Sequence, residues 1–501
     1  MLKCQVLGGF SPFFLLSRRL PIDFVSLSTY SGIQSLVYSR GLNYGLGELL
    51  MSIVAQSLES LEYIVGRDGA VGWDAVEAAM QQQIMAAIAP HPVNPTAPVC
   101  LVYPQTPEQL AGVITLCHQQ HWRVLPCGSG TKLAWGGLAE GITVVVSTAR
   151  LGRLIDHAAG DLTVTAEAGM RLADLQAILA TQGQFLPLDP TCGTDATLGG
   201  IVATADSGTL RHRYGGVRDL LIGMTIVRAD GQVAKAGGRV VKNVAGYDLM
   251  KLFTGSWGTL GILGQVTFRV YPLPDVSQTL VLTGDAQAIA RATQTLLSSA
   301  LTPTAVELVM APAWTELKQT DAIALLVRFQ GIAVGVSTQT QQFTAVGQAL
   351  GLEVRTLQRQ ADAAISPANE VALWQQLQEI GEPTAHNRAI TCKIGVTPST
   401  AVAVLQQIKA LVPQLDLAQI HAGSGLGRLR FAATEAEQLP QIRQLCQDQA
   451  GFLTVLQAPQ SLKQQVDVWG YTGNAIALMR GLKQQFDPSN LLSPGRFISG
   501  I

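Results

Sequence analysis

The 501-residue sequence predicts an α+β protein built from two structural parts. Strands and helices alternate over residues 97–183, and glycine becomes frequent over residues 191–261. After Pro272 glycine becomes less frequent, and helical and strand patterns alternate again. Because a chain of this length can bury more than one hydrophobic core, we expect two or three domains.

The first 50 residues differ in composition from the rest of the chain. They are rich in serine and carry four basic residues against two acidic ones, which fits a transit peptide or a start assigned too far upstream. Regular helical patterns begin at Met51 and cover residues 51–64 and 73–88. We therefore favour Met51 as the start, expect residues 1–50 to be disordered or mis-started, and expect residues 51–96 to form a helical segment.

A strong helix signal follows this segment. Thr106 is a good N-cap, Pro107 suits the first helical position, and Gln109 completes a capping box. Apolar residues then recur on one helical face at Leu110, Val113, Ile114 and Cys117. We expect this helix to open a domain that runs from residue 97 to residue 272.

Strand patterns complete the first domain. They cover residues 122–125, 144–147 and 163–168, and a helical pattern lies between residues 169 and 183. An Asp230-Gly231 pair then indicates a hairpin turn between two further strands.

The second part reads as a mixed α+β domain over residues 275–440. Helical and strand patterns alternate there, and glycine is less frequent than in the first part. A final segment, residues 441–501, contains a helix that places Ile476, Met479, Leu482 and Phe486 on one face. We expect this segment to return to the first domain.

Composition excludes several classes of protein. Charged residues make up 14% of the chain and the net charge is -1, so the net charge does not attract the protein to nucleic acid or to an anionic membrane. The seven cysteines are scattered and never spaced as C-x-x-C, which fits a reducing compartment without a zinc or iron–sulfur site. No apolar run reaches the roughly 20 residues of a membrane span. We expect a cytoplasmic protein without a transmembrane segment.

A glycine-rich loop follows the strand that ends at Leu125. Gly128 and Gly130 would let backbone N–H groups approach a diphosphate closely, although a plain structural turn explains the loop equally well. A dinucleotide-binding Rossmann motif would need a third glycine where Leu133 stands, and an acidic residue about 20 positions further on. The loop alone therefore does not identify a ligand.

Further segments of the same kind follow in order along the chain. Further glycine-containing segments lie at 196–200, 206–208, 214–219, 242–248 and 255–262. Taken together with the first loop, they resemble the flavoproteins of the vanillyl-alcohol oxidase and p-cresol methylhydroxylase (PCMH) family. The resemblance is marked over residues 97–272 and in the 486–496 tail, and within the family it is nearest to the E subunits of bacterial glycolate oxidases.

This resemblance implies a two-part PCMH-type FAD-binding domain with a mixed α+β cap domain. It also implies the residues that hold FAD, namely Pro126, Cys127, Gly128, Ser129, Gly130, Thr131, Lys132, Asp189, Pro190, Thr197, Gly199, Gly200, Ser207, Gly208, Lys242, Asn243, Gly258, Thr259, Gly261 and Ile262. For Thr197 and Ser207 a simpler interpretation is that each caps a turn. Ser493 stands where relatives commonly have asparagine, which leaves that contact open.

Covalent attachment of FAD is not expected. Family members that bind FAD covalently use a histidine or cysteine, commonly a histidine near the first glycine loop. Cys127 is the nucleophile within this loop, and a buried structural thiol is its expected role. The resemblance therefore implies FAD bound without a covalent bond.

Candidate catalytic residues come from the second domain. Relatives that oxidise D-2-hydroxy acids hold a divalent metal with a H-x-G-D-G-N-x-H motif and a later Glu-His pair. Here the matching stretch begins with His421 and ends with Arg428, no Glu-His pair follows, and arginine cannot be a metal ligand. We expect no metal site.

Three side chains remain as candidates for work on a substrate. Arg428 could grip a substrate carboxylate, or it could neutralise a local acid or a subunit contact. Lys393 could neutralise a carboxylate or lie in solvent on a strand. His421 could act as a general base, because imidazole titrates near neutral pH, or it could be a structural histidine.

The expected function is that of an FAD-dependent oxidoreductase subunit of the glycolate oxidase type. It would oxidise a small 2-hydroxy acid by hydride transfer to flavin, within a complex that contains a catalytic flavoprotein subunit and an iron–sulfur subunit. Membrane association, if any, would be peripheral and through these partners. The alternative is a FAD-carrying electron-transfer or non-catalytic subunit whose partner oxidises the substrate.

Overall fold

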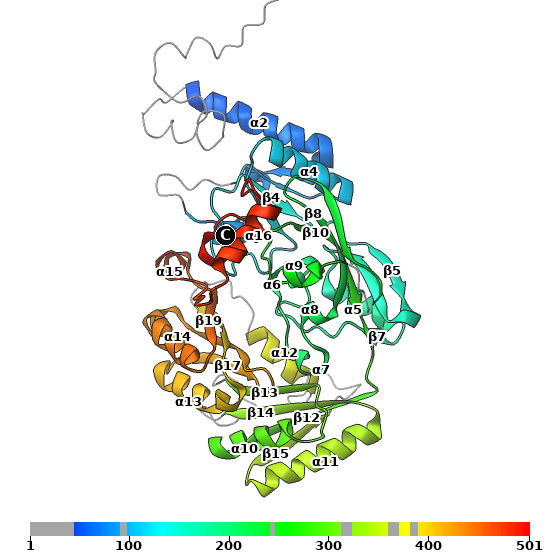
Figure 1. Cartoon of the computed structure of the whole chain (residues 1–501), viewed down its shortest axis with the longest axis vertical. Coiled ribbons are helices and arrows are strands. Elements are labelled where there is room, and N and C mark those ends of the chain that lie inside the picture. Colours follow the sequence, from blue (N-terminus) through cyan, green and yellow to red (C-terminus); the bar gives the residue numbers. More distant parts are fainter. Residues whose placement is uncertain (1–44, 91–97, 241–245, 312–322, 359–369, 381–388) are drawn as a thin grey trace, which may run out of the picture. The chain divides into compact units, whose positions relative to one another are not determined.

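The computed structural model of the chain describes residues 45–90, 98–240, 246–311, 323–358, 370–380 and 389–501 (Figure 1). Two compact units are distinguished, residues 1–59 and residues 60–501. Helix α2 (Gly45–Val65) begins in the first unit and ends in the second. None of the described helices is both long and apolar enough to cross a bilayer. The two sites discussed below lie within the second unit.

A small mixed sheet contains the first glycine loop. Its order is β1-β2-β4-β3, from β1 (Ala70–Gly72), β2 (Cys100–Val102), β3 (Val124–Cys127) and β4 (Val144–Ser147). Strands β2 and β3 both run parallel to β4, and β1 pairs antiparallel with β2. Helices α3 (Ala78–Ala87) and α4 (Pro107–Gln119) connect its strands. The segment 70–72 was expected to belong to a helical region, but it forms an edge strand of this sheet.

The second sheet is formed by strands between residues 154 and 269, a range of the sequence that also contains the other glycine segments. It is antiparallel with the order β5-β6-β10-β8-β9, from β5 (Leu154–Ala158), β6 (Thr163–Glu167), β10 (Ile262–Arg269), β8 (Leu221–Val227) and β9 (Val233–Gly237). A two-stranded pair, β7 (Gln184–Phe185) and β11 (Tyr271–Pro272), lies apart from it. The helices of this region are α5 (Leu172–Ala180), α6 (Leu198–Thr204), α7 (Arg211–Tyr214), α8 (Val217–Leu220) and α9 (Leu249–Phe253).

The third sheet is antiparallel and has eight strands. Its order is β15-β12-β14-β13-β17-β18-β16-β19. The strands are β12 (Val276–Thr283), β13 (Ala305–Met310), β14 (Ala324–Gly331), β15 (Glu353–Gln358), β16 (Ala389–Gly395), β17 (Leu415–His421), β18 (Leu426–Ala432) and β19 (Phe452–Gln457). Because β19 is an edge strand of this sheet, the cap extends beyond the expected boundary at residue 440.

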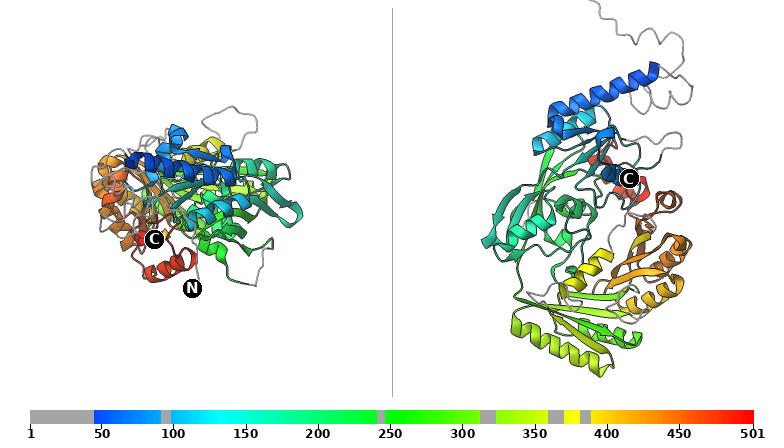
Figure 2. Two further views of the ribbon diagram at one scale, coloured as in Figure 1. Left: turned by 90° about the horizontal axis from the view of Figure 1, so that it is seen from above. Right: turned by 180° about the vertical axis from the view of Figure 1, so that it is seen from behind.

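Each face of the cap sheet is covered differently. One face packs against α10 (Ala286–Leu297), α11 (Ala333–Ala349), α13 (Ala401–Leu411) and α14 (Leu439–Asp448), and forms the largest apolar core. The other face packs against α12 (Glu370–Ile380) through Leu373, Trp374 and Leu377. The view from behind in Figure 2 shows α12, in yellow, opposite the yellow-green α11. On this second face, strands β13, β17, β18, β16 and β19 carry polar residues.

The C-terminal tail returns to the first sheet, as the sequence indicated. After α15 (Gln460–Gln465) and α16 (Ile476–Phe486), the Val124 N–H donates to Leu491 O over 2.8 Å, and the Ser493 N–H donates to Val124 O over 2.9 Å. Within α16 and the turn after it, Lys483 lies 2.6 Å from Asp487 and also donates to the carbonyls of Thr259 and Leu492. The tail is thereby fixed beside the glycine segments.

Local sequence signals were accurate in the first domain. Helix α4 begins at Pro107, and the Thr106 hydroxyl accepts from the Gln109 N–H over 3.2 Å. The Asp230-Gly231 turn joins β8 to β9, and Gly231 has a φ of 83°. These two predictions are confirmed, because the signals depend on neighbours in the sequence.

Candidate active site

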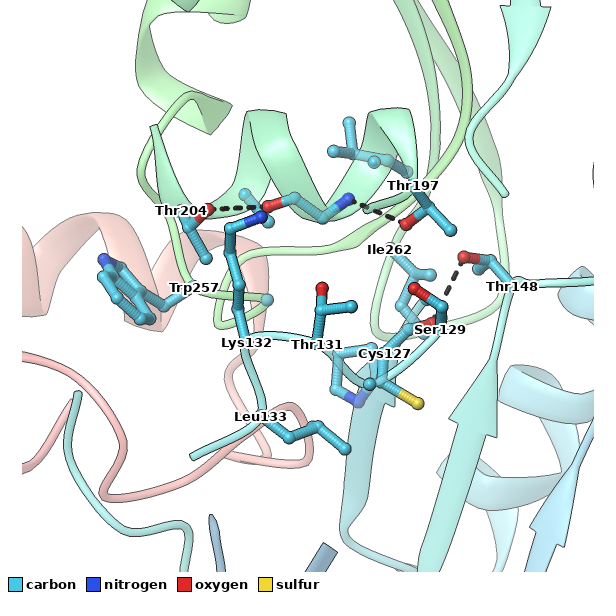
Figure 3. Close-up of a pocket in the computed structure, with 18 of the residues that line it drawn as sticks. Cys127, Ser129, Thr131, Lys132, Leu133, Thr148, Thr197, Thr204, Trp257 and Ile262 are labelled. Atoms are coloured by element: carbon cyan, nitrogen blue, oxygen red, sulfur yellow. Dashed lines mark hydrogen bonds between the residues drawn. The ribbon is translucent and has the colours of Figure 1, made fainter. Parts of the chain in front are cut away.

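A pocket lies where the first two sheets and the tail meet, and it is called the glycine-loop pocket here (Figure 3). Its walls come from the loop after β3, the residue after β4, helix α6, the segment before β10 and the tail. The lining residues are 126–133, Thr148, Thr197, Gly199, Gly200, Ala203, Thr204, 256–258, 261–263 and Arg496.

Glycine is required at two positions of this pocket. A Cβ on Gly128 would lie 2.0 Å from the Thr197 hydroxyl oxygen, so the loop and α6 could not approach as they do. Gly258 has a φ of 72°, and a Cβ there would lie 2.7 Å from Pro126. Glycine at these positions therefore lets the main chain of the loop and of the segment before β10 approach their neighbours closely around a narrow space.

The loop after β3 presents unpaired donors to the pocket. Within the described parts of the chain, the main-chain N–H groups from Gly128 to Lys132 find no acceptor. Partly buried N–H groups of this kind need a partner, and successive N–H groups in a turn form a concave anion site. These donors fit the diphosphate of a dinucleotide cofactor.

Two buried basic side chains fix the backbone that follows this loop. Arg496 donates from Nη2 to the carbonyl of Leu133 over 2.8 Å, and more weakly to those of Lys132 and Trp135. Lys463 donates to the carbonyls of Ala134 and Gly136. Burial lowers the pKa of Arg496 to about 10, so it stays charged near neutral pH. Arg496 Nη1 has no partner among the described residues, so it is available to a ligand.

A second pocket adjoins the first and is called the charged pocket here. Its charged or ionisable lining residues are Asp206, Arg211, Glu307, Lys393, His421 and Arg428. Thr204 and Trp257 line both pockets, so the two spaces are contiguous. Lys132 provides another link, because its Nζ lies 3.5 Å from the Asp206 carboxylate. Figure 3 shows the Lys132 side chain extending from the loop towards Thr204 of α6.

Antiparallel pairing places the charged residues on one face of the cap sheet. Glu307 of β13 lies opposite His421 of β17, and Gln419 of β17 lies opposite Arg428 of β18. Arg428 in turn lies opposite Lys393 of β16. Directly opposite residues share a face, and alternate residues along these strands point into the apolar core on the other side. A polar row thus crosses four strands.

His421 is oriented by its surroundings. Its Nδ1 lies 3.2 Å from the Val306 carbonyl oxygen and 3.1 Å from Glu307 Oε1. Both neighbours are acceptors, so Nδ1 carries the proton in the neutral ring and Nε2 is left as a base. Burial works to lower the pKa of His421, but the Glu307 charge and these contacts raise it above its ordinary value.

His212, the residue next to His421 in space, has a lowered pKa. His212 lies with its ring centroid 5.4 Å from that of His421. Burial, followed by the nearby His421, lowers the pKa of His212 to about 4. His212 is therefore neutral near pH 7, whereas the pKa of His421 lies above its ordinary value.

Asp206 is the common partner of the cations. Arg428 Nη2 donates to its carboxylate over 2.8 Å, and the Thr191 N–H donates over 2.9 Å. Burial works to raise the pKa of Asp206, but Arg428 and Lys132 lower it below its ordinary value. Burial lowers the pKa of Lys393, and the nearby Asp206 opposes this effect. Asp206 therefore keeps several cations together in a buried space.

The structure brings most of the expected site residues together. In the glycine-loop pocket they are 126–132, Thr197, Gly199, Gly200, Gly258, Gly261 and Ile262. In the charged pocket they are Ser207, Gly208, Lys393, His421 and Arg428. Lys242 and Asn243 lie outside the described residues.

Three expected cofactor contacts line neither pocket. The Asp189 carboxylate instead accepts from the Thr209 N–H and hydroxyl, over 2.8 and 2.6 Å, and from the Leu210 N–H. Pro190 follows it, and the Thr259 hydroxyl donates to the Ser256 carbonyl over 2.7 Å. These residues shape the loops rather than face the pockets.

Other lining residues were missed by the sequence reasoning. Asp206 was noticed only as part of a glycine segment, and Arg496 only as part of the tail motif. Glu307, Arg211 and Trp135 carry no local signal, because their importance arises from pairing across strands or between domains. In the residues that the structure describes, no group of three or more His, Cys, Asp or Glu side chains could hold a metal ion.

Comparison with known proteins identifies the class. Residues 98–237 match the model of an FAD binding domain, and residues 468–497 match that of an FAD linked oxidase C-terminal domain. The fold is similar to that of p-cresol methylhydroxylase, with a TM-score of 0.69, 18% identity, and coverage of 88% of this chain and 96% of that chain. The chain is an FAD-dependent oxidoreductase with a PCMH-type FAD-binding fold.

Three relatives show how far the similarity extends. Glycolate oxidase subunit GlcD of Bacillus subtilis is 25% identical over 434 residues, covering 81% of this chain and 90% of that protein. D-2-hydroxyglutarate dehydrogenase of Xanthomonas citri is 26% identical, covering 80% and 89%. Glycolate oxidase subunit GlcE of Escherichia coli is 38% identical over 154 residues, covering 30% and 43%. The expected likeness to E subunits is thus partial, and the likeness to a D subunit extends over most of the chain.

Proposed function

We propose that this chain oxidises a small 2-hydroxy acid by transferring a hydride from the carbinol carbon to FAD. The observation that carries the proposal is the polar row of His421, Arg428 and Lys393, which faces a pocket contiguous with the glycine-loop pocket. The names of two relatives that cover most of the chain refer to glycolate and D-2-hydroxyglutarate, which are both 2-hydroxy acids.

The glycine-loop pocket is proposed to hold the diphosphate of FAD. The unpaired N–H groups of 128–132 would donate to it, and Arg496 Nη1 would supply a fixed positive charge. FAD supplies the hydride acceptor, and the protein supplies orientation and charge.

Binding without a covalent bond is part of this proposal. Burial raises the pKa of the Cys127 thiol to about 12, so its reactive thiolate form is scarce at neutral pH. Acid precipitation should therefore release the yellow cofactor into the supernatant. Retention of the colour in the precipitate would contradict this part of the proposal.

Arg428 and Lys393 are proposed to bind the substrate carboxylate. Arg428 contacts Asp206 through Nη2, so the described contacts leave Nε and Nη1 of the guanidinium group available. A planar guanidinium group suits a carboxylate, and Lys393 adds a second cation one strand away. The contact with Asp206 supports the local-acid interpretation of Arg428 as well, because one arginine can serve both anions.

His421 is proposed to accept the hydroxyl proton. Its Nε2 is the free basic nitrogen, and Glu307 stabilises the imidazolium ion that forms. Removal of the hydroxyl proton increases the tendency of the carbinol carbon to release hydride. Arg428 and Lys393 would meanwhile hold the carboxylate, so that the carbinol carbon stays in one orientation.

A second candidate function is supported by the 154-residue match to an E subunit. In that case the chain would carry FAD for electron transfer or for stability, and a catalytic flavoprotein subunit and an iron–sulfur subunit would complete a cytoplasmic complex. Such a complex could associate peripherally with a membrane through its partners. The candidate predicts that the charged pocket does not turn over substrate in the isolated chain.

One experiment separates the two candidates. The chain is purified alone, its FAD content is measured, and glycolate, D-lactate or D-2-hydroxyglutarate is added without oxygen. The proposed function predicts that at least one acid bleaches the flavin, and that chloride or acetate at the same concentration does not. Bleaching that requires added partner subunits would support the second candidate instead.

A further inference from the structure

The charged pocket has an apolar end that the proposed reaction does not use. Across the cap sheet the polar row continues from Lys393 of β16 to Thr454 of β19, which lies directly opposite. On β19 the residues two positions before and after Thr454 are Phe452 and Leu456, and both line the charged pocket. Alternate residues of a regular strand share a face, so Phe452 and Thr454 project towards the pocket. Leu456 lies at a bulge in the pairing of β19 with β16, and it also lines the pocket.

Tryptophans continue this apolar end beyond the sheet. Trp469 lines the pocket next to β19, and its carbonyl accepts from the Thr454 hydroxyl over 3.1 Å. The ring centroid of Trp469 lies 5.1 Å from that of Trp257, and Trp257 packs with Trp135 and Leu456 in one apolar cluster. Phe452 and Trp469 remain partly exposed, so their apolar surface is accessible from the pocket.

The order of side chains along the sheet sets a direction for a bound substrate. The base His421 lies on β17, the carboxylate-binding cations lie on β18 and β16, and the apolar end begins on β19. A carboxylate at Arg428 and Lys393 and a hydroxyl at His421 leave the third substituent of the carbinol carbon on the side of β19. That substituent would lie against Phe452, Leu456 and Trp469.

We infer that the substrate is a 2-hydroxy acid with a bulky apolar side chain, aromatic or branched, rather than glycolate. This inference rests on the proposed function and specifies its substrate class. Apolar contacts at this end would favour substrates with larger apolar side chains, because one added methylene in an apolar pocket changes specificity by roughly 10-fold to 200-fold. A second carboxylate would meet no cation on β19, where the residues that line the pocket are Phe452, Thr454 and Leu456.

The test is a panel of 2-hydroxy acids on the FAD-loaded full chain. Glycolate, lactate, 2-hydroxyisocaproate, phenyllactate and 2-hydroxyglutarate, each as both enantiomers where they exist, are mixed with the chain without oxygen, and flavin bleaching is followed. We expect the second-order rate constant for phenyllactate or 2-hydroxyisocaproate to exceed that for glycolate by at least about tenfold.

A variant tests whether the apolar end causes this preference. Phe452→Ala removes a partly exposed ring, and the ratio of the rate constants for phenyllactate and glycolate should fall by at least about fivefold, since part of the apolar contact is lost. The control Leu478→Ala, at a side chain that is 66% exposed and outside both pockets, should leave the ratio unchanged. An unchanged ratio in Phe452→Ala would contradict the assigned direction.

The outcomes distinguish failure of this inference from failure of the proposed function. If glycolate or 2-hydroxyglutarate bleaches the flavin as fast as the apolar acids, the inferred substrate class is wrong and the proposed function stands. If no 2-hydroxy acid bleaches a flavin that dithionite still reduces, the proposed function is wrong and the inference falls with it. If Phe452→Ala does not fold, the panel on the unchanged chain decides.

Discussion

The glycine-loop pocket and the charged pocket adjoin each other but are built in different ways. In the first, main-chain N–H groups and close-packed glycines form the surface, and buried Arg496 and Lys463 hold the loop by its carbonyls. In the second, side chains from separate strands meet in a row. A cofactor site made of backbone depends on local sequence, whereas a substrate site made of paired strands depends on the register of the whole sheet.

The largest expected effect concerns the proposed base in the charged pocket. His421→Asn removes the basic nitrogen, and a positioned general base typically contributes at least ~100-fold to the rate. Flavin reduction should slow by about this factor while FAD content is unchanged. The control His121→Asn makes the same change at an exposed residue with a φ of 54°, a conformation that asparagine tolerates. Equal rates in the two variants would exclude His421 as the base.

The second effect concerns the anion-binding side of the same pocket. Arg428→Gln removes a guanidinium group that contacts buried Asp206 and faces the pocket, and loss of such a charge costs on the order of 100-fold in specificity. We expect kcat/KM to fall by that amount, mainly through KM. Arg291→Gln, at an exposed helix position, is the control. If Arg428→Gln lowers the stability of the protein but leaves kcat/KM unchanged, Arg428 has a structural role only.

The third effect tests the other pocket. Gly128→Ala places a Cβ against the Thr197 hydroxyl, and overpacking of about 1–3 kcal/mol would weaken FAD binding by roughly 10-fold to 100-fold. Titration of the apo chain with FAD measures this change. Gly160→Ala has open space around its Cβ and should bind FAD normally. Unchanged affinity in Gly128→Ala would show that the loop does not hold the cofactor.

The smallest effect is a shift of the pH profile. The proposed base works when neutral, so flavin reduction should accelerate as pH rises through the pKa of His421, which Glu307 raises. Burial and Arg211 act in the opposite direction, and His212, with a pKa of about 4, is neutral near pH 7. Glu307→Gln removes the raising carboxylate, so the acid limb should move to lower pH. Glu353→Gln, at an exposed residue, is the control. If the acid limb lies at the same pH in Glu307→Gln as in this control, Glu307 does not raise the pKa of the base.

The contrast between the pockets explains what could be predicted from sequence. The glycine segments predicted FAD because each turn, its glycines and the flanking strand or helix are neighbours in the sequence. Asp206 and Arg428 are separated by 222 positions, and only the packing of the cap against the FAD domain brings them within 2.8 Å. Glu307 and His421 meet through β13–β17 pairing, which no local pattern indicates.

Two departures from the local pattern have the same physical origin. Asp189 was expected near the cofactor, which stays a prediction, and its carboxylate accepts hydrogen bonds from the turn at Thr209 and Leu210. The cap was expected to end at residue 440, yet β19 pairs with β16 and closes the edge of the sheet. In both cases a distant hydrogen-bonding partner, rather than the local residue pattern, determines the position.

The central claim is that both pockets act together in this one chain, and an isotope effect tests it most directly. The isolated, FAD-loaded chain is mixed without oxygen with the preferred 2-hydroxy acid, carrying hydrogen or deuterium on the carbinol carbon, and the rate of flavin bleaching is measured. The account predicts bleaching that is several-fold slower with deuterium, because that carbon–hydrogen bond breaks as the flavin is reduced. A flavin that stays oxidised in the isolated chain would contradict it.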